Sequence, residues 1–210
     1  HGVVGMRTAL KKSCDVYFYE VARKLGIDRL SATAKKFGLG DKVLQNYSEE
    51  KKGTVPDTKW KIRELGKNWY IGETLHSGIG QGYFLTTPLQ LCLMTAQIAN
   101  GGFKIEPKIL IDKDSKVSNL EKFLNHKNST PGNVMSTDDR IFNFGLQPLF
   151  RNQENINLIK DAMFAATNEP GGTSYRSRLN KKEFKFAGKT GSSQIKRFTS
   201  EQREAEVKQE

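Results

Sequence analysis

Three short segments carry the side chains best suited to chemistry, and they lie far apart in the sequence. They are Ser13-Cys14-Asp15, the glycine-rich residues 78–82, and Lys189-Thr190-Gly191 followed by two serines. Taken singly, each has a structural explanation. A serine and an aspartate are typical of a helix N-terminus, where the hydroxyl caps and the acid complements the helix dipole. The glycine spacing matches neither a dinucleotide-binding nor a P-loop motif, so tight turns or close packing explain it better than a phosphate site.

The order of these segments is more specific than any one of them. A Ser-x-Asp near a helix start, a glycine-rich loop, a helix opening with Thr-Thr-Pro and a Lys-Thr-Gly on a strand form the layout of the penicillin-recognising acyl transferases. The likeness extends to residues 13–19, 26–31, 36–38, 78–83 and 171–173. These stretches resemble the penicillin-binding protein 2 family, the class B transpeptidases of rod-shape elongation. The resemblance covers nearly the whole chain and fails mainly over residues 112–140 and in the tail.

This resemblance implies a fold and a reaction. The fold is α+β, the transpeptidase fold shared with serine β-lactamases, in which helices cover an antiparallel sheet and an all-helical lobe lies beside it. We expect the chain to hold the helical lobe and the Lys-Thr-Gly strand, with much of the sheet missing. The implied reaction is acyl transfer from a D-Ala-D-Ala stem peptide, through a serine ester, to an amine on a neighbouring strand. The same site would bind penicillin, and no cofactor is implied.

The resemblance also assigns catalytic roles to three residues. Ser13 is expected in the proton-transfer network beside the nucleophile, and Asp15 is expected to orient the substrate amide. Lys189 would hold positive potential over the site. The assignment depends on one geometric prediction, that Ser13 and Lys189 converge from opposite walls of a single groove.

Substrate binding is assigned to the residues that follow the lysine. Thr190 is expected to hydrogen-bond the substrate carboxylate, and the backbone N–H of Ser192 is expected to stabilise the oxyanion. Gly191 would let the substrate backbone approach closely.

The family's nucleophile lies in a Ser-x-x-Lys upstream of the Ser-x-Asp, and no such motif precedes residue 13. Ser193-Gln194-Ile195-Lys196 matches the letters, but it follows Lys-Thr-Gly on a predicted strand, whereas the nucleophile motif needs a helix start. We therefore expect residues 1–195 to be part of a transpeptidase domain, an internal fragment that is inactive by itself.

Composition excludes several other classes. The formal charge is +11, but Lys outnumbers Arg 24 to 10 and no nucleic-acid-binding module is present, so solvated charge explains the basicity better than nucleic-acid binding. Cys14 and Cys92 have no metal-ligand spacing, and the three histidines are scattered, so no metal site is predicted. No run of 18 apolar residues could span a bilayer.

Two other functions fit parts of the pattern. A D,D-carboxypeptidase or β-lactamase of the same fold would use water as the acyl acceptor. A basic polymer-binding module without chemistry would make Lys189 dispensable.

By resemblance, the intact protein is expected to be anchored in the bacterial inner membrane by a segment outside this sequence, with this domain on the periplasmic side. Its partners would be peptidoglycan stem peptides and a membrane glycosyltransferase of the elongation machinery.

The elements that must position these residues follow from hydrophobic periodicity. Apolar residues at three- and four-residue spacing predict helices, and alternating residues predict strands. The prediction is a helix over 10–25, a second over 28–37, a long ordered loop over 47–70 pinned by Trp60 and Trp69, helices over 88–99 and 156–166, and strands over 103–111 and 184–195. Residues 112–140 are expected to be a variable surface insertion, and residues 196–210 a polar tail.

Overall fold

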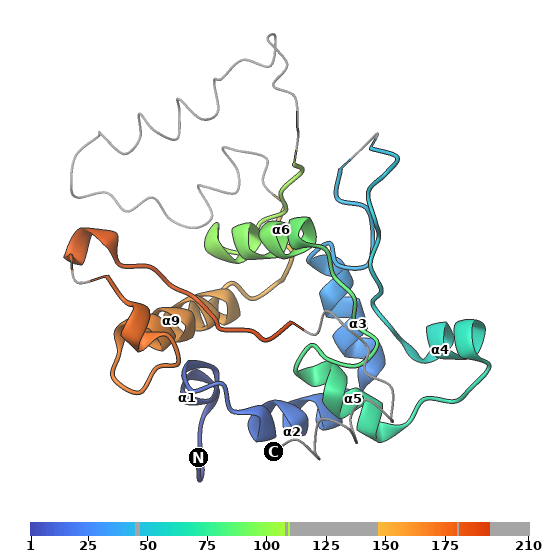
Figure 1. The fold of residues 1–210 in the computed structure, drawn as a ribbon, viewed down its shortest axis with the longest axis horizontal. Coiled ribbons are helices and arrows are strands. Elements are labelled where there is room, and N and C mark those ends of the chain that lie inside the picture. Colours follow the sequence, from blue (N-terminus) through green and yellow to red (C-terminus); the bar gives the residue numbers. More distant parts are fainter. Residues whose placement is uncertain (45–46, 108, 110–146, 180, 194–210) are drawn as a thin grey trace, which may run out of the picture.

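The computed structural model describes residues 1–44, 47–107, 109, 147–179 and 181–193, and the fold within them is almost entirely helical (Figure 1). The predicted insertion at 112–140 and the tail at 196–210 lie outside these residues. The α-helices are α1 (Met6–Lys11), α2 (Asp15–Leu25), α3 (Ile27–Lys36), α4 (Thr58–Leu65), α5 (Ile71–Gly78), α6 (Pro88–Ala99) and α9 (Glu154–Asn168). Two 3₁₀ turns follow at Tyr175–Ser177 and Lys182–Phe184.

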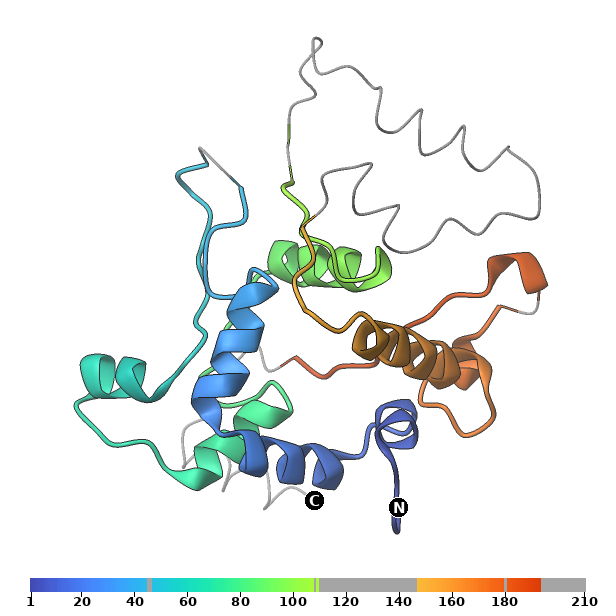
Figure 2. The same ribbon diagram turned by 180° about the vertical axis from the view of Figure 1, so that it is seen from behind.

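Helix α1 packs against α9 although more than 140 residues separate them in the sequence (Figures 1 and 2). Small side chains make this possible, since Ala9 on α1 and Ala162, Ala165 and Ala166 on α9 are all at most 1% exposed. Alanines let two helix backbones approach closely, so the two ends of the described chain form one packed unit.

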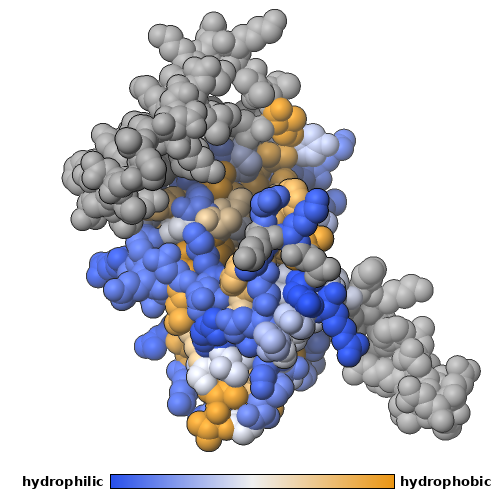
Figure 3. All heavy atoms as spheres, turned by 90° about the vertical axis from the view of Figure 1, so that its left-hand side faces the viewer, coloured by the Kyte–Doolittle hydropathy of each residue, from blue (hydrophilic) through white to orange (hydrophobic). Residues whose placement is uncertain are grey.

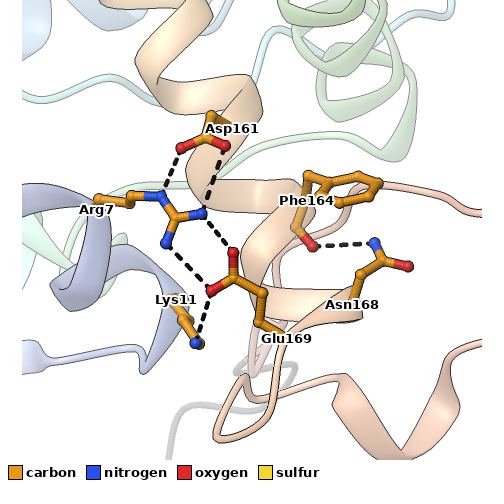
Figure 4. Close-up of polar contacts among 6 residues, drawn as sticks. All are labelled: Arg7, Lys11, Asp161, Phe164, Asn168 and Glu169. Atoms are coloured by element: carbon orange, nitrogen blue, oxygen red, sulfur yellow. Dashed lines mark hydrogen bonds and ion pairs between the residues drawn. The ribbon is translucent and has the colours of Figure 1, made fainter.

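Ion pairs join the same two helices at their solvent-facing edge (Figure 4). The Arg7 guanidinium donates through Nε to Asp161 Oδ2 at 2.5 Å and through Nη2 to Glu169 Oε1 at 2.5 Å. Lys11 Nζ donates to Glu169 Oε2 at 2.8 Å. Both cations lie on α1 and both acids on or just after α9, so this cluster fixes the register of one helix on the other.

A glycine permits the close contact between α2 and α5. A Cβ atom added to Gly78 would lie 2.4 Å from the Ala22 Cβ and 3.2 Å from the Phe18 carbonyl oxygen. The glycine-rich segment therefore serves close packing, as its spacing predicts, and the following turn uses positive φ angles at Gly80 and Gly82.

Helix α6 matches the predicted boundaries but not the predicted buried face. Thr87 caps it by accepting from the Gln90 N–H, and Pro88 is its first residue. The buried face holds Leu93 between Gln90 and Gln97, whereas Cys92, which the apolar spacing that predicts this helix places on the inward face, is exposed. The two glutamines are buried because each carries hydrogen bonds that tie neighbouring loops to the helix.

The hydrogen bonds of these glutamines satisfy backbone carbonyl and N–H groups of the loops that are not paired within a helix or a strand. Gln90 Nε2 donates to the carbonyls of Asp41 and Lys52, both at 2.7 Å. Gln97 Nε2 donates to the Phe37 carbonyl at 3.0 Å, and its Oε1 accepts from the Ile105 N–H at 3.1 Å. Buried polar groups without partners are costly, so these side chains anchor the loops around α6.

The stretch predicted as one loop over 47–70 contains helix α4. Asp57 caps it by accepting from the Trp60 N–H at 2.7 Å. Both tryptophans pin the stretch as predicted, since the Trp60 and Trp69 rings lie 5.3 and 6.2 Å from the ring of Tyr83. Lys61, only 2% exposed, forms an ion pair with Glu73 on α5 inside this aromatic cluster.

Two other predictions about the elements are wrong. The continuous helix predicted over 10–25 is broken between α1 and α2, because Ser13 adopts φ +48°. The strands predicted over 103–111 and 184–195 do not form within the described residues, where only the isolated bridges Thr54–Leu85 and Phe103–Pro148 occur. An extended segment becomes a strand only beside a partner, and no neighbouring strand is present in the described part of the chain.

The two phenylalanines on one face of the second predicted strand could have anchored it to a helix, but they face outward. Phe184 is 55% exposed and Phe186 is 41% exposed. The described residues thus hold the helical part of an α+β fold together with the segment that carries Lys189.

The surface is predominantly polar. The face shown in Figure 3 is mostly hydrophilic, with apolar side chains in patches between the charged ones. Among the described helices, none combines the length and the apolar character needed to cross a bilayer.

Substituting Gly78→Ala should destabilise the protein by about 1–3 kcal/mol, because the new methyl group would overlap α2 in a well-packed interface. Gly72→Ala, in the same helix with no atom within 4 Å of the added Cβ, is the matched control and should be neutral or slightly stabilising. Thermal unfolding of the purified variants measures both. Equal melting temperatures would mean that α5 does not pack on α2 as described.

Stability should fall with acid as Glu169 becomes protonated. Hydrogen bonds from Arg7 and Lys11 lower the pKa of Glu169 from 4.5 to about 2. A carboxyl group with a lowered folded-state pKa contributes stability that is complete above its unfolded pKa and is lost as the pH falls towards the folded value. The difference in melting temperature between wild type and Glu169→Gln should therefore shrink between pH 4.5 and about 2. A constant difference across that range would contradict the ion pairing.

Candidate functional site

The Ser13 hydroxyl lies in a sharp turn between two helices. Helix α1 ends at Lys11, α2 begins at Asp15, and Ser13 is the only non-glycine residue with positive φ among the described residues. The turn is secured by the buried Cys14, whose N–H donates to the Ala9 carbonyl at 2.8 Å. Residues other than glycine rarely adopt a positive φ angle, and those that do are often found at functional sites.

The interpretation of the Ser13 hydroxyl as a helix N-terminal cap is therefore wrong. The residue that caps α2 is Cys14, and no side chain makes a capping hydrogen bond there. The hydroxyl is instead turned towards another segment of the chain.

That segment is the extended stretch 185–193, and α9 holds it in place. The Gly188 N–H donates to the Met163 carbonyl at 3.2 Å, and Asn168 Nδ2 donates to the Phe186 carbonyl at 2.8 Å. Figure 4 shows Asn168 at the end of the same helix that carries the acids of the ion-pair cluster. The helix therefore performs the anchoring that a neighbouring strand would perform in a sheet.

The central contact of the site joins Lys189 to Ser13. Lys189 Nζ donates to Ser13 Oγ at 2.6 Å and to the Thr190 carbonyl at 2.9 Å. The two side chains are 176 positions apart in the sequence, and this contact confirms the prediction that they converge.

Two threonine hydroxyls extend this contact into a chain of hydrogen bonds. Thr190 Oγ1 donates to Thr173 Oγ1 at 3.2 Å. Thr190 Oγ1 also lies 3.4 Å from Ser13 Oγ, and either hydroxyl can be the donor in this pair. The hydrogen-bond chain runs from Lys189 through Ser13 and Thr190 to Thr173.

Thr173 is the site residue that sequence reasoning missed. Its backbone N–H donates to the Lys11 carbonyl at 3.2 Å, two residues before Ser13. The signal was present in the Gly-Gly-Thr of residues 171–173. A Cβ on Gly172 would lie 2.3 Å from the Ala166 carbonyl oxygen, so only glycine brings this loop close enough to α9 to place Thr173.

The other predicted site residues, Asp15, Gly191 and Ser192, are not part of this hydrogen-bond chain. Asp15 is the exposed first residue of α2, and the described residues offer it no hydrogen-bond or ion-pair partner. Gly191 and Ser192 are exposed beyond Thr190, and they make no hydrogen bond to Ser13 within the described part of the chain, so their assigned roles stay predictions.

Asp15 acts on the site through its charge. Desolvation by the surrounding protein lowers the pKa of the Lys189 amine below its ordinary value, and the carboxylate of Asp15 opposes this shift. A lysine with a lowered pKa exchanges its proton more readily near neutral pH than a free one. Desolvation therefore makes the Lys189 proton easier to release, whereas the Asp15 carboxylate favours the charged amine.

The chain has two stretches with the Ser-x-x-Lys spacing. In Ser48-Glu49-Glu50-Lys51, Ser48 lies in a turn and begins no helix. The motif from Ser193 to Lys196 extends beyond the described residues. Among the described residues, no three His, Cys, Asp or Glu side chains gather as a metal site would require.

The chain is similar to a well-defined group of proteins. A family described as the penicillin binding protein transpeptidase domain matches residues 1–208. The peptidoglycan D,D-transpeptidase MrdA of Acinetobacter baumannii is 33% identical over 196 residues, which cover 93% of this chain and 26% of that protein. The MrdA of Escherichia coli K12 is 30% identical over 195 residues, with 93% and 28% covered.

Solved structures agree with these relatives. Helicobacter pylori penicillin-binding protein PBP2, in a complex with MreC, has a TM-score of 0.71 at 29% identity, covering 93% of this chain and 31% of that one. Pseudomonas aeruginosa PBP2 in complex with WCK 5153 also has a TM-score of 0.71, at 32% identity, with 91% and 39% covered. The chain thus spans between about a quarter and two fifths of the length of these four proteins.

Replacing Asp15 by Asn should lower the pKa of Lys189 further, because it removes the negative charge that opposes desolvation. The pH dependence of the NMR signal from a ¹³C-methylated Lys189 measures this pKa. Glu20→Gln is the matched control on the same helix, since Glu20 pairs with Arg23 and not with the site. An unchanged or higher pKa in Asp15→Asn would show that the carboxylate does not act on the amine.

Proposed function

Because the chain belongs to the penicillin-binding protein transpeptidase domain family and resembles its PBP2 members, we propose that the complete protein is a peptidoglycan D,D-transpeptidase. It would cross-link D-Ala-D-Ala stem peptides by serine acyl transfer and would be acylated by penicillin in the same way. The observation that carries this proposal is the 2.6 Å contact between Lys189 Nζ and Ser13 Oγ. It brings two of the family's three motifs into one site.

The hydrogen-bond chain suits proton transfer. In acyl transfer a serine nucleophile loses a proton, and the leaving amine must gain one. Ser13 can both accept and donate, and it lies between the Lys189 amine and the Thr190 hydroxyl, so it can pass a proton without moving far. The nucleophilic serine of this mechanism is expected in a Ser-x-x-Lys outside residues 1–210.

The same residues suit recognition of a peptide C-terminus. The Lys189 ammonium supplies positive potential, and the Thr190 hydroxyl would donate a hydrogen bond to a carboxylate once its proton turns away from Thr173. Gly191 and Ser192 continue the segment, where the Ser192 N–H would serve as an oxyanion donor. The carboxylate of penicillin would occupy the position of the stem-peptide terminus.

Cellular context follows from the family likeness. We propose an inner-membrane protein whose transpeptidase domain lies in the periplasm and works with a membrane glycosyltransferase during elongation. The structure of the H. pylori relative in a complex with MreC supports the coarser expectation that a protein of this kind works with a protein partner.

The test is covalent labelling of the complete protein by a fluorescent penicillin. Lys189→Ala should slow acylation about 100-fold or more, because it removes the group that orders Ser13 and its protons. Lys185→Ala is the matched control on the same segment, since Lys185 Nζ lies over the Phe164 ring, 5.9 Å from its centroid, and makes no hydrogen bond to Ser13 among the described residues. Equal acylation of wild type and Lys189→Ala would contradict the role given to Lys189, and absence of labelling in the wild type would favour a non-catalytic binding module.

Product analysis separates transpeptidation from hydrolysis. Muropeptides made by the wild-type protein should be cross-linked. Products that are only trimmed would assign the protein as a D,D-carboxypeptidase of the same fold.

A further inference from the structure

Glu169 links two parts of the site although it does not contact the reacting groups. It follows the last residue of α9, and its carboxylate accepts from both cations of α1 (Figure 4). Lys11 Nζ is 2.8 Å from Oε2, and Arg7 Nη1 is 3.1 Å from the same oxygen. One carboxylate therefore joins the end of α1 to the end of α9.

Both ends lead directly into the hydrogen-bond chain. Lys11 is two residues before Ser13, and Glu169 is four residues before Thr173. The backbone closes the same loop, since the Gly172 N–H donates to the Glu169 carbonyl at 3.0 Å and the Thr173 N–H donates to the Lys11 carbonyl at 3.2 Å. A shift of Glu169 relative to Lys11 would move both hydroxyls.

The link is electrostatic and partly sheltered from water. The Lys11 side chain is 15% exposed and that of Glu169 is 34% exposed, whereas Asp161, the other acid of the cluster, is 53% exposed. The amide of a glutamine would keep the shape of Glu169 but could not balance two cations. Substitution by Gln therefore tests the charge with little change in volume.

We propose that Glu169 is a positioning residue for acyl transfer, holding the Lys11 carbonyl and the Thr173 loop so that Ser13, Thr190 and Thr173 stay in hydrogen-bond range. This inference rests on the proposed function. Misplacing catalytic groups by about 1 Å can cost up to roughly 100-fold in rate. A residue outside the reacting set can thus control the rate by fixing the distance between groups inside it.

Asp161 provides an internal control within the same cluster. It accepts from Arg7 Nε at 2.5 Å, so its loss also weakens the contact between α1 and α9. It makes no hydrogen bond to Lys11 or to the loop that carries Thr173 within the described residues. A purely structural role for the cluster would make Glu169 and Asp161 equivalent.

The experiment measures the acylation rate constant of the complete protein at saturating fluorescent penicillin. This rate constant is independent of the fraction of folded molecules, which the labelling amplitude reports separately. Glu169→Gln should lower the rate constant about tenfold, and Lys11→Gln, which breaks the same link from the other side, should lower it similarly. Asp161→Asn should stay within about twofold of wild type.

Normal acylation in Glu169→Gln and Lys11→Gln would overturn this inference, as would an equal loss of rate in Asp161→Asn. A reduced amplitude with an unchanged rate constant would also overturn it, because it would show that the ion pairs serve stability alone. If the wild-type protein is not labelled, the proposed function fails. Labelling of wild type with no effect of Glu169 rejects only the positioning role.

Discussion

Helix α9 is the common support for both walls of the site. On one side its alanines pack against α1, which ends just before Ser13. On another its Met163 carbonyl and Asn168 side chain hold the segment that carries Lys189. A single helix, α9, therefore sets the distance between the Ser13 hydroxyl and the Lys189 amine, because it contacts both of the segments that carry them.

Polar side chains take over much of the work that a sheet would do. Extended and looped backbone leaves N–H and carbonyl groups that must find partners when they are buried. Here Gln90, Gln97 and Asn168 provide them, each from a helix to a neighbouring loop. This explains why a chain with almost no regular strand in its described part still orders its long connections. It also explains why residues that hydrophobic periodicity places on the polar side are among the most buried.

The chemistry of the site comes from the way in which donors are arranged. Lys189 donates to Ser13, so the serine oxygen is held close to a positive charge, and the Thr190 hydroxyl lies 3.4 Å from the same oxygen. Desolvation makes the amine a weaker base, and Asp15 limits that effect. The strained turn at Ser13 keeps the hydroxyl out of the helix-capping role that its sequence position would otherwise favour.

Local sequence was sufficient for several elements, and the family resemblance was sufficient for the identity of the central pair. Thr87 and Pro88 predicted the start of α6 correctly because capping depends on neighbouring residues, and the resemblance carried by the order of the motifs predicted that Ser13 and Lys189 would meet. The Gly-Gly-Thr of residues 171–173 marked a likeness but not the role of Thr173, because that role depends on how tightly Gly172 packs against α9. The break at Ser13 was missed because a continuous apolar stripe is compatible with one helix or two, and only the packing of α1 on α9 selects two. Within the predicted strand, residues 185–193 are extended but unpaired, because strand formation requires a partner and tertiary contacts with helix α9 anchor this segment instead.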